Sequence, residues 1–203
     1  MSKVKSQTAS IGLRAKTARA IAVVLAGPLD APRVVRRTEL TLADPAAPAT
    51  SQPYHEVMDL PWDKAQLAVK KIASRIEAVA SKALARLVKE VQAEGYVVSG
   101  VGVVGAGDRN LERIGSTHIR AHAAEGVLFR RVLEVAAQEN SLPSRRLDER
   151  SLDESAASEL NLPVTKLKGQ LAEMGRAVGS PWRTDEKAAT IAAWLALAAP
   201  RRK

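Results

Sequence analysis

The run from Tyr96 to Val104 is almost unbroken in its apolar character and is rich in valine. Runs of this kind are typical of strands buried in sheets that helices cover on both faces. Apolar residues recur at helical spacing before the run, with Asp63 as the expected N-cap and Gly95 as the expected end of the helix. A second helical pattern follows over about Ser116–Glu139. The sequence therefore predicts an α/β fold around a buried central strand.

The segments that flank this centre predict strands early in the chain and helices late. Residues 9–26 read as one strand with a short polar elbow, residues 33–43 as a half-exposed second strand, and His55–Leu60 as a short third strand. Pro143–Leu147 predicts another short strand, and a last helix is expected from Thr184 or Asp185 through Ala199. The predicted order is three strands, helix, strand, helix, strand and helices.

The composition suits one folded domain. The chain has 203 residues, of which 46% are hydrophobic, so it is long enough to bury a core. It has no Cys, which excludes a disulfide framework and a thiolate metal site. No apolar run has the length of a membrane span, and no apolar leader precedes a cleavage site. We expect a flexible N-terminus over 1–8, a domain over 9–199, a basic tail over 200–203, a cytoplasmic location and no membrane partner.

The formal net charge of +9 favours a polyanionic partner, of which nucleic acid is the commonest. Residues 1–37 hold eight Lys and Arg against one acid, Asp30. The alternative is a solvated basic surface that keeps the protein soluble. The predicted contacts with phosphate are Arg14, Lys16, Arg19, Arg36, Arg37, Arg120 and Arg146.

Several stretches together resemble one group of proteins. Ile11–Leu25, with an apolar start, a polar elbow and a second apolar run, resembles the opening hairpin strand of ribonuclease H-like nucleases of the RuvC and YqgF type. Gly115–Arg131 is similar to a helix of the RuvC-type resolvases, and Asp148-Glu149-Arg150 to the end of a YqgF strand. Asp185–Ala192 resembles the final resolvase helix. The resemblance implies a ribonuclease H-like mixed sheet, three antiparallel strands followed by parallel strands, flanked by helices.

The chain departs from this resemblance at the metal ligands. Arg14 stands where the family carries a metal-binding Asp, and a guanidinium cannot ligate a cation. The strand Val97–Val104 holds no acid, and Ala188 stands at the second carboxylate position of the last helix. Because two-metal hydrolysis needs several carboxylates, we expect a non-catalytic, resolvase-like domain. It would bind a DNA junction or structured RNA, or act as a scaffold, and it would form a homodimer as such resolvases do.

Two other functions stay open. In the first, the chain is an active endonuclease with a rearranged acidic site of Asp108, Asp148, Asp185 and Glu186, which would require Mg²⁺ or Mn²⁺; otherwise no cofactor is expected. The structural explanation of these acids is a turn cap at Asp108, an ion pair of Asp148 with Arg146 or Arg150, and a helix N-cap at Asp185. In the second, the chain is a protein-interaction module that does not contact nucleic acid.

Two side-chain groups leave their own alternatives. His118 and His122 share a helix face, with Glu125 one turn later, so a divalent metal would find two ligands there, and a third would make a zinc site. The alternative is an ordinary surface pair, because Arg120 disfavours a cation. Arg14 either grips a phosphate or forms an ion pair with Asp185 or Asp148.

Overall fold

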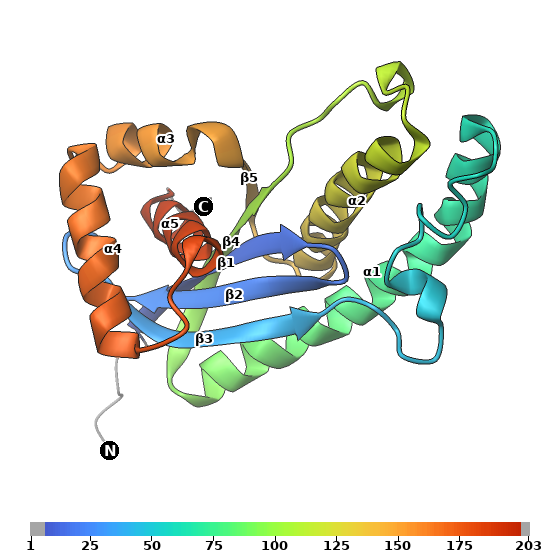
Figure 1. Ribbon diagram of the computed structural model, residues 1–203. Helices are drawn as coiled ribbons and strands as arrows, with labels where there is room; N and C mark the ends of the chain where they lie inside the picture. The colour runs from blue at the N-terminus through green and yellow to red at the C-terminus, as the bar shows by residue number, and fades with distance from the viewer. Residues whose placement is uncertain (1–6, 200–203) are drawn as a thin grey trace.

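The computed structural model describes residues 7–199. The expected tail over 200–203 and residues 1–6 of the expected N-terminal segment therefore lie outside the described residues. One mixed sheet has the order β3-β2-β1-β4-β5, with β1–β2 and β2–β3 antiparallel and β1–β4 and β4–β5 parallel (Figure 1). The expected ribonuclease H-like mixed sheet is confirmed. The strands are β1 (Gln7–Lys16), β2 (Arg19–Ala26), β3 (Arg33–Thr41), β4 (Tyr96–Gly105) and β5 (Ser144–Asp148).

Helices cover both faces of the sheet, and each face has its own apolar core. One core joins alternate residues of the strands to α1 (Trp62–Ala93) and α2 (Thr117–Glu139). The other core joins the opposite strand faces to the last three helices, because successive strand residues point to opposite sides. These helices are α3 (Leu152–Glu159), α4 (Val164–Val178) and α5 (Thr184–Ala198). Among the described residues, no helix combines the length and apolar character needed to cross a membrane.

Two expectations about the early strands are wrong. Residues 9–26 form two strands of a hairpin rather than one, because the chain reverses at a tight turn where Ala18 has a φ of 63°. The hairpin leaves Arg33–Thr41 to become the third strand. Residues 55–60 form turns instead of a strand, and they follow a 3₁₀ turn, η1, at Pro48–Thr50.

The later elements follow the prediction closely. Gly95, with a φ of +88°, ends α1 as expected, although Pro61 and not Asp63 occupies the N-cap position. Ser116 caps α2, and its hydroxyl accepts a hydrogen bond from the amide of Ile119 at 3.3 Å. The remaining 3₁₀ turns are η2 (Leu111–Arg113) and η3 (Glu149–Ser151).

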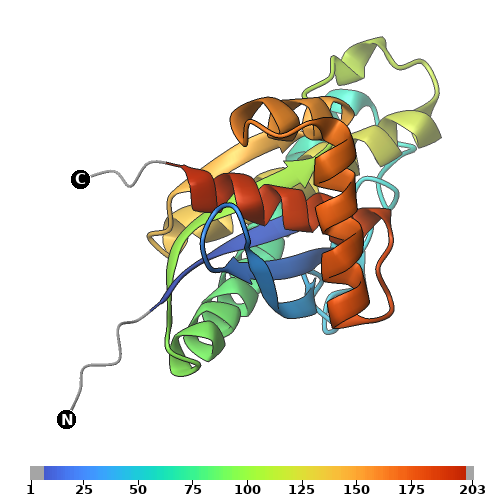
Figure 2. The same ribbon diagram turned by 90° about the vertical axis from the view of Figure 1, so that its left-hand side faces the viewer.

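Helix α5 lies directly against the backbone of the sheet (Figure 2). A Cβ atom added to Gly12 would lie 1.8 Å from the carbonyl oxygen of Ala189, and one added to Gly102 would lie 2.2 Å from that of Ala192. Such distances are far inside van der Waals contact, so no side chain fits at either position. The absence of a side chain at Gly12 and at Gly102 thus allows the close approach of α5.

A matched spacing holds α5 in register along β1. The hydroxyl of Ser10 donates a hydrogen bond to the carbonyl of Ala193 at 2.6 Å, and Gly12 faces Ala189. Two strand residues span about 6.6 Å and four helix residues about 6.0 Å, so the next pair along both elements is residue 14 with residue 185. The packing of α5 therefore places its first turn beside Arg14.

The close approach at Gly12 predicts a large loss of stability on substitution. We expect Gly12→Ala to lower the free energy of unfolding by about 3 kcal/mol, because α5 would have to move away from its backbone contact. Urea unfolding followed by circular dichroism measures this. Gly169→Ala is the control, since a Cβ there meets no atom within 4 Å, and it should keep or raise stability by up to about 1 kcal/mol. Equal stability of Gly12→Ala and wild type would contradict the packing argument.

Candidate functional site

The carboxyl ends of the three parallel strands meet at one edge of the sheet. Strands β1, β4 and β5 run in the same direction, and the first turn of α5 lies beside the end of β1. In open α/β sheets, ligands bind outside this edge. Asp108 follows β4, Asp148 ends β5, and Asp185 and Glu186 lie in the first turn of α5. We therefore take this carboxyl edge as the candidate site.

Arg14 lies at the centre of the edge and is 8% exposed. Its Nη2 donates to Oε1 of Glu149 at 2.5 Å, and its Nε donates to Oδ1 of Asp185 at 3.2 Å. Of the two alternatives for Arg14, the structure shows the ion pair with Asp185; a second pair joins it to Glu149, and none joins it to Asp148. Since two carboxylates hold the guanidinium and little of it is exposed, Arg14 acts here as the centre of an ion-pair group.

Lys16 completes this group from the next outward position on the same face of β1. Its Nζ lies 3.2 Å from Oδ2 of Asp185. Burial raises the pKa of the Asp185 carboxyl, but the hydrogen bonds and positive charges of Lys16 and then Arg14 outweigh burial, and the pKa lies below its ordinary value of 3.8. Asp185 is therefore ionised at neutral pH, with both of its oxygens beside a cation.

The other acid beyond β4 is also bound to cations. Asp108 accepts hydrogen bonds from Arg130 at 2.6 Å and Arg146 at 2.8 Å. The hydrogen bond from Arg130, with the charges of both arginines, keeps the pKa of Asp108 below its ordinary value. The expected turn cap is thus replaced by a double ion pair. Asp108 is 63% exposed at its side chain, but its oxygens already have partners.

The remaining two acids have backbone partners. Asp148 accepts from the backbone amide of Arg150 at 2.9 Å and so caps η3, where an ion pair with Arg146 or Arg150 was expected. Glu186 is buried and accepts from the backbone amide of Arg183 at 2.7 Å. Arg183 is the N-cap residue of α5, so the prediction that Asp185 occupies that position is wrong.

The four acids do not assemble as metal ligands. Within residues 7–199, the one group of three or more His or acidic side chains whose ligand atoms approach one another within 4.8 Å consists of His55, His118 and His122. Imidazoles, not carboxylates, therefore form the candidate metal ligand set. His118 and His122 share a face as predicted, and the third member comes from the segment before α1.

Glu149 and His55 are the residues that the sequence reasoning missed as site residues. A signal existed for Glu149, because it directly follows a strand predicted to end at the carboxyl edge. His55 had no comparable signal, since it lies 63 positions before His118 and only the packing of the chain joins them.

The seven predicted phosphate contacts all have partners within the protein. Besides Arg14, Lys16 and Arg146, Arg19 pairs with Glu39 at 2.7 Å, and Arg36 pairs with Glu90 and Glu94. Arg37 donates to backbone carbonyls of the turn that precedes α5, and Arg120 donates to the carbonyl of Ile114. The polar groups of these seven side chains are therefore already engaged within the protein.

Other cations at the carboxyl edge have no acidic partner. They belong to the segment between β4 and α2, to η3, and to the start of α5. Among the described residues, none of them forms an ion pair. These cations are Arg109, Arg113, Arg150, Arg183 and Lys187.

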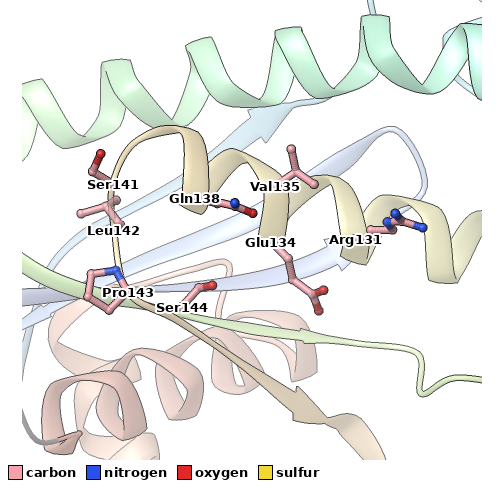
Figure 3. Close-up of a pocket in the computed structure, with 8 residues that line it drawn as sticks. All are labelled: Arg131, Glu134, Val135, Gln138, Ser141, Leu142, Pro143 and Ser144. Atoms are coloured by element: carbon pink, nitrogen blue, oxygen red, sulfur yellow. The ribbon is translucent and has the colours of Figure 1, made fainter. Parts of the chain in front are cut away.

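A depression of about 630 Å³ lies at the opposite edge of the sheet (Figure 3). The C-terminal half of α2 forms one side, and the turn that leads into β5 forms the other. The side chains shown there include Arg131, Glu134 and Gln138 on α2. Because β5 starts here and ends at the carboxyl edge, this depression is separate from the candidate site.

No known family profile matches the chain, and no curated protein matches its sequence. Among solved structures, a RuvC from T. thermophilus in complex with a Holliday junction substrate has a TM-score of 0.49 at 13% sequence identity, covering 92% of this chain and 90% of that chain. A second Thermus thermophilus RuvC structure has a TM-score of 0.47 at 15% identity, covering 92% of each chain. This chain is similar in fold to both.

The ion-pair group predicts a pH-dependent effect of Asp185→Asn. We expect it to lower the free energy of unfolding by about 2 kcal/mol at pH 7, because Arg14 and Lys16 lose a charged acceptor. Since the pKa of Asp185 is lowered by folding, its contribution is present above the ordinary pKa and disappears as pH falls through the folded-state value. The gap between variant and wild type should therefore narrow towards pH 3, as measured by urea unfolding.

The exposed pair of Asp153 with Lys168, at 3.6 Å, provides the control. Asp153→Asn should change stability by no more than about 0.5 kcal/mol. A gap for Asp185→Asn that is the same at both pH values would show that charge is not its cause.

Proposed function

We propose that this chain is a non-catalytic, resolvase-like domain that binds nucleic acid through its phosphates at the carboxyl edge of the sheet. The proposal combines the sequence resemblance to RuvC-type and YqgF-type proteins, the net charge of +9 and the charge pairing at this edge. Phosphate contacts position a protein on nucleic acid without reading bases. The partner is accordingly defined by backbone shape, as in a DNA junction or a structured RNA. Homodimer formation stays a prediction.

The observation that carries the proposal is the uneven pairing of charges. The acids Asp108, Asp185 and Glu149 are each in contact with Arg or Lys. Their negative charge is thus compensated within the protein, although the segment before α2 also holds Glu112. The five unpaired cations named above remain available to a polyanion, and Arg suits phosphate because its planar guanidinium donates two parallel hydrogen bonds.

The ion pairs of Arg14 also support the proposal that this domain does not hydrolyse nucleic acid. Two-metal hydrolysis requires oxygen ligands that are free to bind Mg²⁺ or Mn²⁺. Here Arg14 occupies the place of an expected metal ligand, and Asp185 and Glu149 already bind its guanidinium. A cation entering this group would have to displace a fixed positive charge.

The first test is a gel-shift titration against a four-way DNA junction, a duplex and a structured RNA. We expect binding whose affinity falls linearly on a log–log plot of salt concentration, because phosphate binding releases counterions. The double variants Arg109→Gln/Arg113→Gln and Arg183→Gln/Lys187→Gln should each lower the salt slope by about two, one for each phosphate contact removed.

The matched control is Arg86→Gln/Lys89→Gln on the C-terminal part of α1. It removes the same charge, but this end of α1 leads into the start of β4 at the opposite edge. Its affinity and salt slope should stay close to those of the wild type. Equal losses for all three double variants would show that charge acts non-specifically and would remove the carboxyl edge as the binding surface.

The second test is cleavage of the same junction with Mg²⁺ or Mn²⁺. We expect the wild type to leave the strands uncut over hours, as a sequencing gel with end-labelled strands would show. Cleavage by the wild type that Asp185→Asn abolishes would replace the proposal with an active endonuclease. Cleavage that survives this substitution would point to a contaminating nuclease.

A further inference from the structure

All three histidines of the chain meet at one place. The sequence contains three His residues, and one ring nitrogen from each lies within 4.8 Å of those of the other two. The ring centroids of His55 are 5.2 Å from His118 and 4.4 Å from His122, and the latter two are 4.6 Å apart. With no Cys in the chain, this cluster gathers all the imidazole and thiolate side chains that the protein could offer a borderline metal ion.

Two elements supply the cluster. His118 and His122 are four residues apart on α2, which places them on one face of its first turns. His55 belongs to the turns between η1 and α1. His118 and His122 are exposed and His55 is half-buried, so the cluster opens to solvent on one side. A ligand bound there would connect a segment without regular secondary structure to a helix.

Glu125 holds His55 in place through two contacts. Its carboxylate is completely buried, and its Oε1 lies 2.8 Å from Nδ1 and 3.3 Å from the backbone amide of His55. When Nδ1–H donates to this oxygen, the lone pair of Nε2 is left to bind a cation. A carboxylate that orients an imidazole in this way is the usual outer partner of a metal-bound histidine.

The second oxygen of this carboxylate gives independent support. Among the described residues, Oε2 of Glu125 is buried and has no hydrogen-bond partner. A buried, partly unsatisfied carboxylate is costly, and a positive charge on the neighbouring imidazole group would reduce that cost. A cation bound to His55 supplies such a charge.

Arg120, whose positive charge was expected to disfavour a metal ion at the histidines, has its own partners. Nε of Arg120 donates to the carbonyl of Ile114 at 2.9 Å, and its guanidinium lies over the ring of Trp62, 5.5 Å from the centroid. Arg120 is therefore bound on its own side of α2. The N-terminus of α2 opposes a cation weakly, but Ser116 already caps it.

We propose that His55, His118 and His122 bind a Zn²⁺-type divalent cation, with Glu125 as the positioning residue for His55. Zn–N distances of about 2.0–2.1 Å place tetrahedral ligand atoms about 3.4 Å apart, so small side-chain rotations suffice to close the site. Three protein ligands leave the fourth position for water. Imidazole prefers Zn²⁺, Cu²⁺ or Ni²⁺ to Mg²⁺ or Mn²⁺, so this site is chemically distinct from a nuclease centre and independent of the function proposed above.

The experiment is a Zn²⁺ titration of the full chain, purified without a histidine tag, in competition with a chromogenic chelator. We expect one Zn²⁺ per chain and no competing effect of Mg²⁺. His122→Ala and His118→Ala should each weaken binding by more than about 100-fold, and Glu125→Gln by about 10- to 100-fold, as outer partners do. Gln138→Ala, on the same helix and outside the cluster, is the control and should bind as the wild type does.

Circular dichroism and thermal unfolding accompany each titration. Zn²⁺ should raise the unfolding temperature of the wild type and of Gln138→Ala but not of His122→Ala, because Zn²⁺ stabilises the folded state only of a variant that binds it. If His122→Ala does not fold, the exposed His118→Ala carries the comparison. The proposal is overturned if the wild type does not bind Zn²⁺ at micromolar concentrations, or if the histidine variants bind it as tightly as the wild type.

Discussion

The contact between α5 and the sheet determines where the charged groups of this protein meet. Gly12 and Gly102 let the helix backbone approach the strands, and Ser10 fixes its register through a hydrogen bond to Ala193. Two residues of β1 span nearly the same length as four residues of α5, so Asp185 is placed beside Arg14. A helix held further away by ordinary side chains would leave a buried guanidinium with one acidic partner fewer, at a considerable cost in stability.

Much of the fold could be predicted because its signals are local. The valine-rich run of β4, the cap at Ser116 and the glycine that ends α1 each act within a few residues. The first hairpin was missed because its turn has Ala18 at positive φ, where sequence patterns favour Gly or Asn. The strand expected at His55–Leu60 does not form. The segment makes turns instead, and the contacts of His55 with the histidines of α2 are too distant in the sequence for a local pattern to indicate.

The candidate site could be predicted only in part. The resemblance to resolvases pointed to Arg14 and left an ion pair with Asp185 as one of two alternatives, and the structure shows this pair. The choice of Glu149 over Asp148 depends on which of two neighbouring residues turns towards β1 after β5 ends. Likewise, Glu125 was considered as a metal ligand, whereas the structure gives its carboxylate to His55. Long-range packing decides such details, and no short sequence pattern encodes it.

The guanidinium of Arg14 holds two carboxylates at neighbouring donors, Glu149 at Nη2 and Asp185 at Nε. Replacing it with a short neutral side chain would leave an empty space between like charges, which only a proton, water or a dissolved cation could fill. The charge balance of this site therefore depends on one side chain, because without it Glu149 would lose the cation that binds it and Asp185 would keep Lys16 alone.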